Sequence, residues 1–338
     1  LTLTVTNVNK KPTDIALSSS SIIENSVGGV VVGDLTATDP DTGDTHSFSV
    51  VGGTGLSQFE INANNQLVVK SGAVLDYETL QNPTVIIRAT DSGGLSFDET
   101  LTLTVTDVNE APTEITLDNL SVKENSASAH VANISGTDPD GDALIYSIVG
   151  GADAAMFEIS ASGDMLHLAT GVSADYEADS ELEVQLQAKD PEGLIFSKSF
   201  TIAVTNVNEA PSAVTLSNFT VTENDTGSGW WWNGGATVGT LEVSDVDAGD
   251  SVTLSLSGAD AEVFEIETRS DDSGSPVHYL KLKADITADF ETQPSYNLTL
   301  NATDLGGLST PTDVVIDVID VYEENTHPTN ITLSSSVI

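Results

Sequence analysis

Four short motifs recur in the same order three times along this chain of 338 residues, and this repetition restricts its possible folds. They are a Glu-Asn pair, an Asp-x-Asp loop, an Asp-aromatic-Glu triplet and an Asp-x-x-Gly-Leu turn, written ENS, DPD, DYE and DSGGL in the first copy. The aspartates that begin the last motif, Asp91, Asp190 and Asp304, are 99 and 114 residues apart. Because each copy has the length of a small domain, we expect a tandem array of domains.

The motifs divide the chain into three complete repeats with a fragment at each end. The expected parts are the last strand of a preceding repeat (1–9), repeat 1 (10–109), repeat 2 (110–208), repeat 3 (209–325) and the start of a further, truncated repeat (326–338). Repeat 3 is longer because of two insertions, a Trp-rich loop in GSGWWWNGG and an extended hairpin near RSDDSGSPVHY. The first residues read as a strand already under way, so we expect a piece of a longer protein.

Within each repeat, apolar and polar residues alternate at period two, as in TLTLTVTDV (100–108) and YLKLKAD (279–285). Such runs predict half-buried strands, and clusters of Gly, Asn, Asp and Pro separate them. We find no convincing amphipathic helix. About seven short strands per repeat predict an all-β chain of β-sandwiches.

Composition excludes several classes of partner. The chain has 10 Lys and Arg residues against 52 Asp and Glu, a net charge of −42. This charge opposes nucleic-acid binding and adsorption to anionic membranes, and it favours metal cations. Cysteine is absent, which excludes disulfides and thiolate metal sites. No apolar run approaches the length of a membrane span, so we expect no membrane insertion.

The acidic motifs have the spacing of metal ligands. In Asp76-Tyr77-Glu78 an extended backbone puts both carboxylates on one face and the ring on the other, toward the core. Two carboxylates about 4 Å apart repel by roughly 4 kcal/mol at an effective dielectric constant near 20, and a divalent ion removes this penalty. Oxygen ligands without a His or Cys cluster favour Ca²⁺ over Mg²⁺, which demands strict octahedral geometry. A single such motif would be read as a solvated turn, but ordered recurrence predicts calcium.

Together the motifs resemble cadherin repeats, specifically the tandem repeats of very large bacterial (RTX-type) surface adhesins. The resemblance covers nearly the whole chain and implies immunoglobulin-like Greek-key sandwiches joined by calcium-binding linkers. In that family the Glu-Asn and DxE motifs lie at the base of one repeat. The linker DxN(D/E) crosses the junction, and DxD and the Asp of DxGG lie at the top of the next repeat.

The resemblance implies calcium ligands at two complete junctions and two partial ones. The first junction would use Glu24, Asp76, Glu78, Asp107, Asn109, Glu110, Asp138, Asp140 and Asp190. The second would use Glu124, Asp175, Glu177, Asn208, Glu209, Asp245, Asp247 and Asp304. A partial site at the start would use Asn9, Asp39, Asp41 and Asp91, and one at the end would use Glu223, Asp289, Glu291 and Asp320.

Three departures from the family pattern affect these sites. Asn206 replaces the linker aspartate of the second junction, which predicts a weaker or missing ion there. At the start, NVNKK lacks both linker acids. At the end, the longer DVYEENTHP leaves open whether Glu323, Glu324 or Asn325 is the ligand.

The motifs and the resemblance favour a non-enzymatic, calcium-rigidified spacer in an extracellular adhesin at a bacterial cell surface. Its expected partners are Ca²⁺, neighbouring repeats and a polysaccharide or another surface protein. The alternative is a ligand-binding module in which Trp230, Trp231 and Trp232 contact a sugar ring, a partner protein or a second copy of the chain.

Enzyme readings are disfavoured. The DTG triplets at Asp41 and Asp225 lack the strand context of aspartic proteases, and a glycosidase carboxylate pair is not expected once per repeat. The histidines at 46, 130, 167, 278 and 327 are scattered, and we expect ordinary strand or loop residues.

Overall fold

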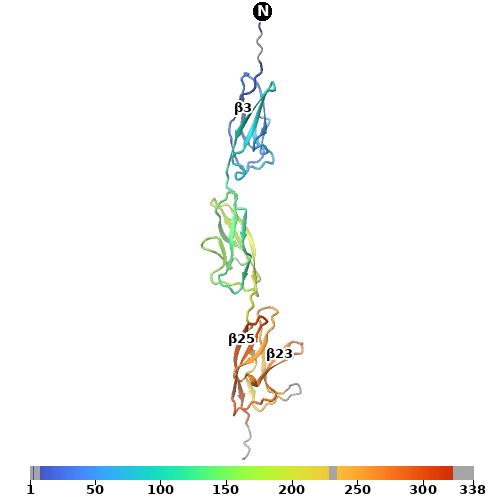
Figure 1. Ribbon diagram of the computed structural model, residues 1–338. Helices are drawn as coiled ribbons and strands as arrows, with labels where there is room; N and C mark the ends of the chain where they lie inside the picture. The colour runs from blue at the N-terminus through green and yellow to red at the C-terminus, as the bar shows by residue number, and fades with distance from the viewer. Residues whose placement is uncertain (1–2, 4–7, 228–233, 323–338) are drawn as a thin grey trace, which may run out of the picture. The chain divides into compact units, whose positions relative to one another are not determined.

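The computed structural model describes residue 3 and residues 8–227 and 234–322 (Figure 1). Within these residues the secondary structure is all β, apart from two single-turn 3-10 helices, η1 (Ala154–Met156) and η2 (Ala261–Val263). The all-β prediction is confirmed. The described part contains no helix that is long and apolar enough to cross a membrane.

Contacts between Cα atoms group the chain into two units. One comprises residues 1–120, 130–170 and 183–202, and the other comprises residues 121–129, 171–182 and 203–338. The division passes through the predicted repeat 2. All ligands predicted for the first junction lie in the first unit, and all those predicted for the second junction lie in the second unit.

Repeat 1 contains nine strands. They are β1 (Asp14–Leu17), β2 (Ser21–Ile23), β3 (Val31–Thr38), β4 (His46–Gly52), β5 (Phe59–Ile61), β6 (Gln66–Val69), β7 (Thr84–Asp91), β8 (Ser96–Thr102) and β9 (Thr104–Thr106). One sheet has the order β1-β3-β6-β5 and a second has the order β4-β7-β8, while β2 pairs in parallel with β9.

The core of repeat 1 follows from the period-two alternation. Along β7, Val85, Ile87 and Ala89 are fully buried while the residues between them are not. They pack with Phe59 and Leu67 from the other sheet in one apolar cluster, as a sandwich requires. Burial of each large side chain in such a cluster contributes about 1.5–3 kcal/mol.

Repeat 2 has the same strand order. Its strands are β10 (Glu114–Leu117), β11 (Ser121–Lys123), β12 (His130–Thr137), β13 (Ile145–Gly150), β14 (Phe157–Ile159), β15 (Met165–Leu168), β16 (Glu181–Lys189) and β17 (Ile195–Thr205). They form sheets of order β10-β12-β15-β14 and β11-β17-β16-β13.

Repeat 3 repeats this topology, with sheets of order β18-β20-β23-β22 and β19-β25-β24-β21. Its strands are β18 (Thr215–Leu216), β19 (Thr220–Thr222), β20 (Thr237–Glu242), β21 (Thr253–Ser257), β22 (Phe264–Ser270), β23 (Pro276–Leu282), β24 (Ser295–Thr303) and β25 (Ser309–Ile319). The hairpin of β22 and β23, seven residues in each strand, contains the second insertion. Trp230, Trp231 and Trp232 of the first insertion lie outside the described residues.

A parallel strand pair places the acidic motifs in each repeat. Pairing of β2 with β9 ends at Ile23 and Thr106, so the Glu-Asn motif emerges beside the strand that leads to the linker. The asparagines of this motif, Asn25, Asn125 and Asn224, have φ values of 57°, 58° and 60°. Asparagine is one of the few residues that adopts this left-handed conformation readily, which explains its presence after each glutamate.

Candidate metal centres at the repeat junctions

Glu24 organises the first junction. Its side chain is only 3% exposed, and its two carboxylate oxygens accept hydrogen bonds from different segments. Oε2 accepts from the backbone N–H of Tyr77 (2.8 Å), and Oε1 accepts from that of Val108 (2.7 Å). This buried carboxylate therefore ties the Asp-aromatic-Glu triplet to the start of the linker.

The triplet lies in a turn and not in the extended segment that the sequence predicted, because the backbone N–H of Leu80 donates to the carbonyl of Asp76 (2.9 Å). The Tyr77 side chain packs against the core of repeat 1. Asp76, Glu78 and Glu24 each have a carboxylate oxygen within 4.8 Å of the other two. Three carboxylates thus converge at the base of the repeat.

Linker residues connect this group to acids of the next repeat. The backbone N–H of Glu110 donates to Asp140 Oδ2 (2.8 Å), and Asn109 Nδ2 donates to Asp190 Oδ2 (2.9 Å). Oxygens of Glu78, Glu110 and Asp140 also lie within 4.8 Å of one another. The structure therefore brings together acids from two repeats, as the family resemblance implies.

Several of these carboxylate oxygens are buried without a hydrogen-bond donor. Among the described residues, Glu110 Oε2, Asp138 Oδ2 and Asp140 Oδ1 accept no hydrogen bond. Burial of a charged oxygen without a partner is costly, and such atoms are rare in folded proteins. A set of converging, unsatisfied oxygens without nitrogen or sulfur ligands fits a hard cation such as Ca²⁺.

The pKa values of these acids are raised because their carboxylates lie close together and partly out of water. The pKa of Glu78 is raised by partial removal from water and then by the negative charges of Glu24 and Asp140. Partial desolvation, followed by the charges of Asp140 and Glu24, also raises the pKa of Asp107. The pKa of Glu110 is raised for the same reasons, although a hydrogen bond from Asn25 opposes the shift.

The second junction repeats the anchoring geometry. Glu124 is 2% exposed and accepts hydrogen bonds from the backbone N–H groups of Tyr176 and Val207, each at 2.7 Å. The backbone N–H of Glu209 donates to Asp247 Oδ2 (2.8 Å). Carboxylates of Glu124, Glu177 and Glu209 converge, and Asp175 is beside them in the same pocket.

Its remaining acids also match the first junction. Asn208 Nδ2 donates to Asp304 Oδ2 (2.7 Å), as Asn109 does to Asp190. Glu209 Oε2 and Asp245 Oδ2 are buried without a donor among the described residues. Partial desolvation and then the charges of Glu124 and Asp247 raise the pKa of Glu209.

Asn206 makes the second junction differ from the first. Its Nδ2 donates to Glu177 Oε1 (3.1 Å) and to Asp247 Oδ1 (2.9 Å). At the first junction the corresponding residue is Asp107, a further acid that raises the local negative charge. The amide of Asn206 therefore satisfies two carboxylate oxygens that would otherwise be available to a cation.

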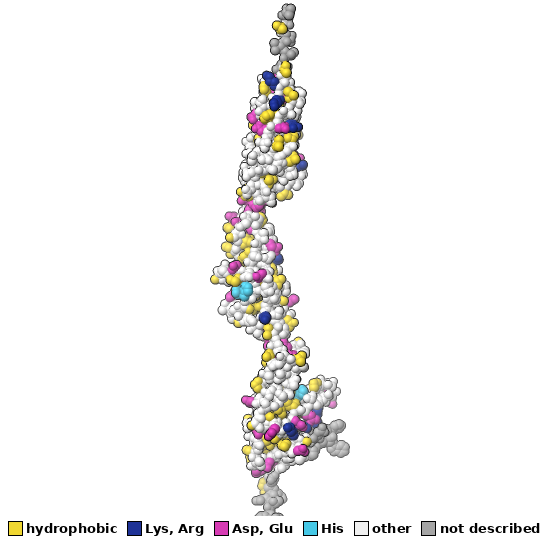
Figure 2. Space-filling view, viewed as in Figure 1, with side chains coloured by type: hydrophobic (Ala, Val, Ile, Leu, Met, Phe, Trp, Pro, Cys, Tyr) yellow, Lys and Arg dark blue, Asp and Glu magenta, His cyan; other side chains and the backbone are white. Residues whose placement is uncertain are grey.

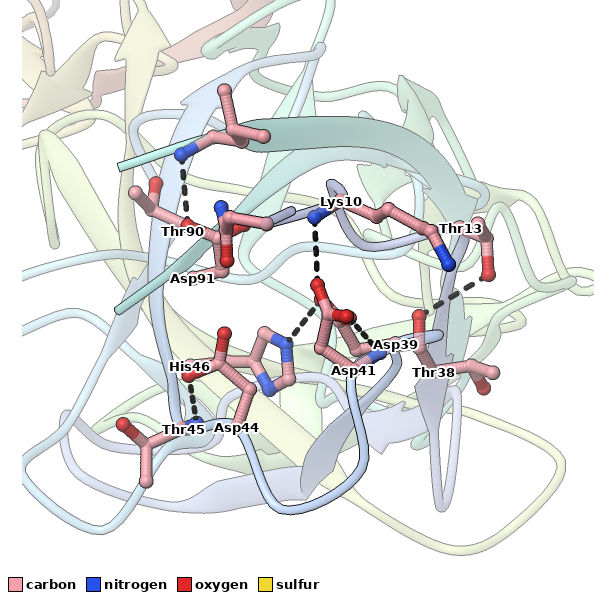
Figure 3. A network of polar contacts seen from close by, with 12 residues as sticks. Lys10, Thr13, Thr38, Asp39, Asp41, Asp44, Thr45, His46, Thr90 and Asp91 are labelled. Carbon is pink, nitrogen blue, oxygen red and sulfur yellow. Dashed lines mark hydrogen bonds and ion pairs between the residues drawn. The ribbon is translucent and has the colours of Figure 1, made fainter. Parts of the chain in front are cut away.

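The partial site at the start of repeat 1 is largely satisfied by protein donors (Figure 3). The backbone N–H of Lys10 donates to Asp41 Oδ2 (2.6 Å), and Asn9 Nδ2 donates to Asp91 Oδ2 (3.0 Å). Asp39 Oδ1 accepts from the backbone N–H of Asp41 (2.8 Å). The four predicted residues therefore lie together, but several of their carboxylate oxygens already accept hydrogen bonds from the protein.

His46 is a member of this site that the sequence reading missed. Its Nε2 lies 3.2 Å from Asp39 Oδ2. Figure 3 draws His46 beside Asp39 and Asp41. The strand register places His46 opposite Asp91. The corresponding residue of repeat 2 is Leu144, directly before Ile145, which pairs with Lys189. The matching oxygen of repeat 2, Asp138 Oδ2, has no donor, so the histidine occupies the place expected for a cation.

A further acid was also missed in two repeats. Oxygens of Asp44 lie within 4.8 Å of those of Asp39 and Asp91, and Asp142 is likewise grouped with Asp138 and Asp140. Both follow the glycine of the DPD loop, and this recurrence was the available signal.

Of the site predicted at the end of repeat 3, the structure describes the residues that belong to repeat 3 itself. Glu223 is 2% exposed and accepts from the backbone N–H groups of Phe290 (2.9 Å) and Val321 (2.6 Å). Hydrogen bonds from Thr292 lower the pKa of Asp289. Glu291 follows in the triplet and Asp320 comes directly after β25. The linker candidates Glu323, Glu324 and Asn325 lie outside the described residues.

Comparison with known proteins agrees with this geometry. Residues 18–106 match the cadherin domain model. A crystal structure of the Protocadherin GammaB4 extracellular domain superposes with a TM-score of 0.59 at 24% identity, covering 93% of this chain and 50% of that chain. The chain has the fold of tandem cadherin-like domains, and its residues 18–106 match the cadherin domain itself. At this identity the structural likeness concerns the fold alone.

Curated relatives are cadherins of animals. Cadherin-related family member 2 of Homo sapiens is 29% identical over 320 residues, which cover 88% of this chain and 24% of that protein. Cadherin-4 of Mus musculus is 31% identical over 223 residues, which cover 57% of this chain and 24% of the relative. The chain thus spans about a quarter of the length of these relatives.

These matches support part of the sequence interpretation. Cadherin repeats are non-enzymatic modules, in agreement with the prediction that this chain is not an enzyme. The named relatives are animal proteins, so they give no support to a bacterial adhesin of the RTX type.

Proposed function

We propose that these cadherin repeats are an extracellular adhesion spacer whose linkers become rigid when calcium binds. The observation that carries the proposal is the set of buried carboxylate oxygens at the first junction, Glu110 Oε2, Asp138 Oδ2 and Asp140 Oδ1, which accept no hydrogen bond among the described residues. A divalent cation would satisfy these oxygens and neutralise the repulsion between their carboxylates.

The first junction offers calcium the larger number of oxygens. Its acids come from the base of repeat 1, the linker and the top of repeat 2, so an ion shared by them would restrict the linker torsions. The ion would be held by carboxylates of Glu24, Asp76, Glu78, Asp107, Glu110, Asp138 and Asp140, with Asn109 and Asp190 beside them. Because Asn206 already donates to two acids, we expect fewer or weaker ions at the second junction.

Ion supply supports an extracellular location. Extracellular calcium modules commonly bind with dissociation constants of about 10⁻⁴–10⁻³ M, which suits tissue fluid or sea water rather than cytoplasm. Adhesion at a cell surface is proposed from the cadherin relatives. A bacterial surface adhesin as the parent protein stays a prediction of the sequence.

Small-angle X-ray scattering of the whole chain, with Ca²⁺ and then with a chelator, tests the spacer function. We expect removal of calcium to change the maximum dimension and to increase flexibility. A matched variant, Asp138→Asn with Asp140→Asn, should resemble the chelated protein at the first junction even when Ca²⁺ is present. Identical scattering in all three conditions would exclude calcium-dependent rigidity.

Recognition through Trp230, Trp231 and Trp232 stays the alternative prediction for this chain. A glycan and protein binding screen of the whole chain beside Trp231→Ala addresses it. Binding that is lost in the variant would support a ligand-binding module, whereas binding by neither form would support the spacer.

A further inference from the structure

His130 and His167 form a pair on the outer face of a repeat 2 sheet. They are directly opposite each other on β12 and β15, with ring centroids 5.0 Å apart and ring planes at 63°. Leu166 and Leu168 on either side of His167 are buried, so the imidazoles stand on the solvent side. Figure 2 shows histidine side chains at the surface of this repeat, with acidic side chains on the same face.

A carboxylate extends this pair into a row. Glu158 on β14 is directly opposite His167, so three adjacent strands present Glu158, His167 and His130 side by side. Side chains of directly opposed residues are close enough to interact. The Glu158 carboxylate accepts from one hydroxyl, Thr170 Oγ1, at 3.0 and 3.3 Å from its two oxygens.

The other repeats have different side chains at the same three positions. Strand register gives Val31, Val68 and Glu60 in repeat 1, and Thr237, Lys281 and Glu265 in repeat 3. In repeat 3 the Lys281 ammonium lies 3.1 Å from Glu265 Oε1, so a cation faces the glutamate. A metal ion held by the imidazoles would provide the equivalent positive charge in repeat 2.

We propose that His130, His167 and Glu158 form a site for a borderline divalent transition metal of the class of Zn²⁺, Ni²⁺ and Cu²⁺. Imidazole suits these ions, whereas Ca²⁺ takes oxygen ligands, so the site is chemically distinct from the junction sites. The ion would link β12, β15 and β14 and stabilise repeat 2 by mass action.

The ring separation is compatible with such an ion. Tetrahedral Zn²⁺ at about 2.1 Å from each of two nitrogens requires these nitrogens to be about 3.4 Å apart. Ring nitrogens lie outside their centroids, so centroids 5.0 Å apart allow this separation after small rotations of the side chains. With two imidazoles and one carboxylate from the protein, water would complete the coordination.

Calorimetric titration of the whole chain with ZnCl₂, in excess Ca²⁺ to occupy the acidic junctions, tests the proposal. We expect one tight Zn²⁺ per chain. Loss of an outer-sphere partner alone typically weakens a metal site about 10–100-fold, so His167→Val should weaken binding at least about tenfold. Valine already occupies this row position in repeat 1, which makes the variant compatible with the fold. His278→Val on β23 is the matched control and should retain wild-type affinity.

A spectroscopic measurement separates the imidazoles from the many acids of the chain. Electron paramagnetic resonance of bound Cu²⁺ should show coupling to two nitrogen ligands, reduced in His130→Val. Equal Zn²⁺ affinity of His167→Val and the wild type would overturn the proposal. A wild-type Cu²⁺ spectrum without nitrogen coupling would overturn it as well, whether or not any variant folds.

Discussion

Asn206 Nδ2 donates a hydrogen bond to Asp247 Oδ1 over 2.9 Å, in a linker position that carries an aspartate at the first junction. The same amide group also donates to Glu177. Asn206 thus provides a hydrogen-bond donor where the first junction has a negative charge. We therefore expect the two junctions to differ in the number or affinity of the calcium ions that they bind.

We expect Asn206→Asp to raise the number or affinity of calcium ions at the second junction, because it restores a carboxylate and releases Asp247 and Glu177. Isothermal titration with Ca²⁺ measures both quantities. The reciprocal change, Asp107→Asn, is the matched control and should lower affinity at the first junction. Unchanged titration curves for both variants would show that this linker position does not set calcium binding.

We expect Glu24→Gln to destabilise the base of repeat 1 even without calcium. The substitution leaves one of two backbone N–H donors, Tyr77 or Val108, without an acceptor, at a cost of about 1–3 kcal/mol. Hydrogen–deuterium exchange of the calcium-free chain should show faster exchange at these amides. Glu60→Gln on the exposed side of β5 serves as the control. Equal protection of these amides in both variants would show that Glu24 does not hold the two backbone segments in place.

The raised pKa values of Glu78, Asp107 and Glu110 predict that these three acids contribute stability to the calcium-free protein that is lost as pH rises. The native state holds these protons more tightly than the unfolded chain, whose carboxyl groups titrate near pH ~4. Between that pH and the raised pKa values these three groups bind more protons in the native state, so their contribution to stability falls with increasing pH.

Chemical denaturation in calcium-free buffer across this range measures the effect. With saturating Ca²⁺ the dependence should reverse, because the ion binds the ionised carboxylates and its affinity falls on acidification. The same dependence of stability on pH in the calcium-free wild type and in a calcium-free Glu78→Gln variant would contradict the assignment of Glu78 to a crowded acidic site.

We expect Phe264→Ala to destabilise repeat 3 by about 3–5 kcal/mol, the usual cost of removing a buried phenylalanine. Phe264 is 2% exposed, and its ring makes an edge-to-face contact with Tyr296 at 5.3 Å between centroids. All three tryptophans of the chain belong to repeat 3, so tryptophan fluorescence during denaturation reports on it. Phe219→Ala, at a site 49% exposed, should have little effect.

The sequence predicted the elements whose signal is local. Period-two alternation identifies strands such as β7 and β24, and recurrence of the acids identifies residues that the structure brings together as candidate ligands. The extended backbone predicted for Asp76, Tyr77 and Glu78 was wrong, because the segment closes a turn through the hydrogen bond from Leu80 N–H to Asp76 O.

Features that depend on strand register were not predictable in this way. His130 and His167 are 37 residues apart in sequence, and their pairing requires the register of β12 with β15, including an irregularity beside His130. The contact of His46 with Asp39 has the same origin, since it depends on which residue of β4 lies opposite Asp91. Whether two histidines lie together therefore depends on the tertiary structure and cannot be read from their spacing in the sequence.

The two hydrogen bonds of Glu24 have a consequence for the energetics of metal capture. The carboxylate holds the backbone at Tyr77 and Val108 without any ion, so part of the proposed coordination shell would already be ordered before calcium binds. Ordering these segments then costs the ion little entropy, so modest affinity suffices to close the remainder. Loss of calcium would therefore make only the linker residues after Val108 more mobile. The backbone up to Val108 would keep its conformation.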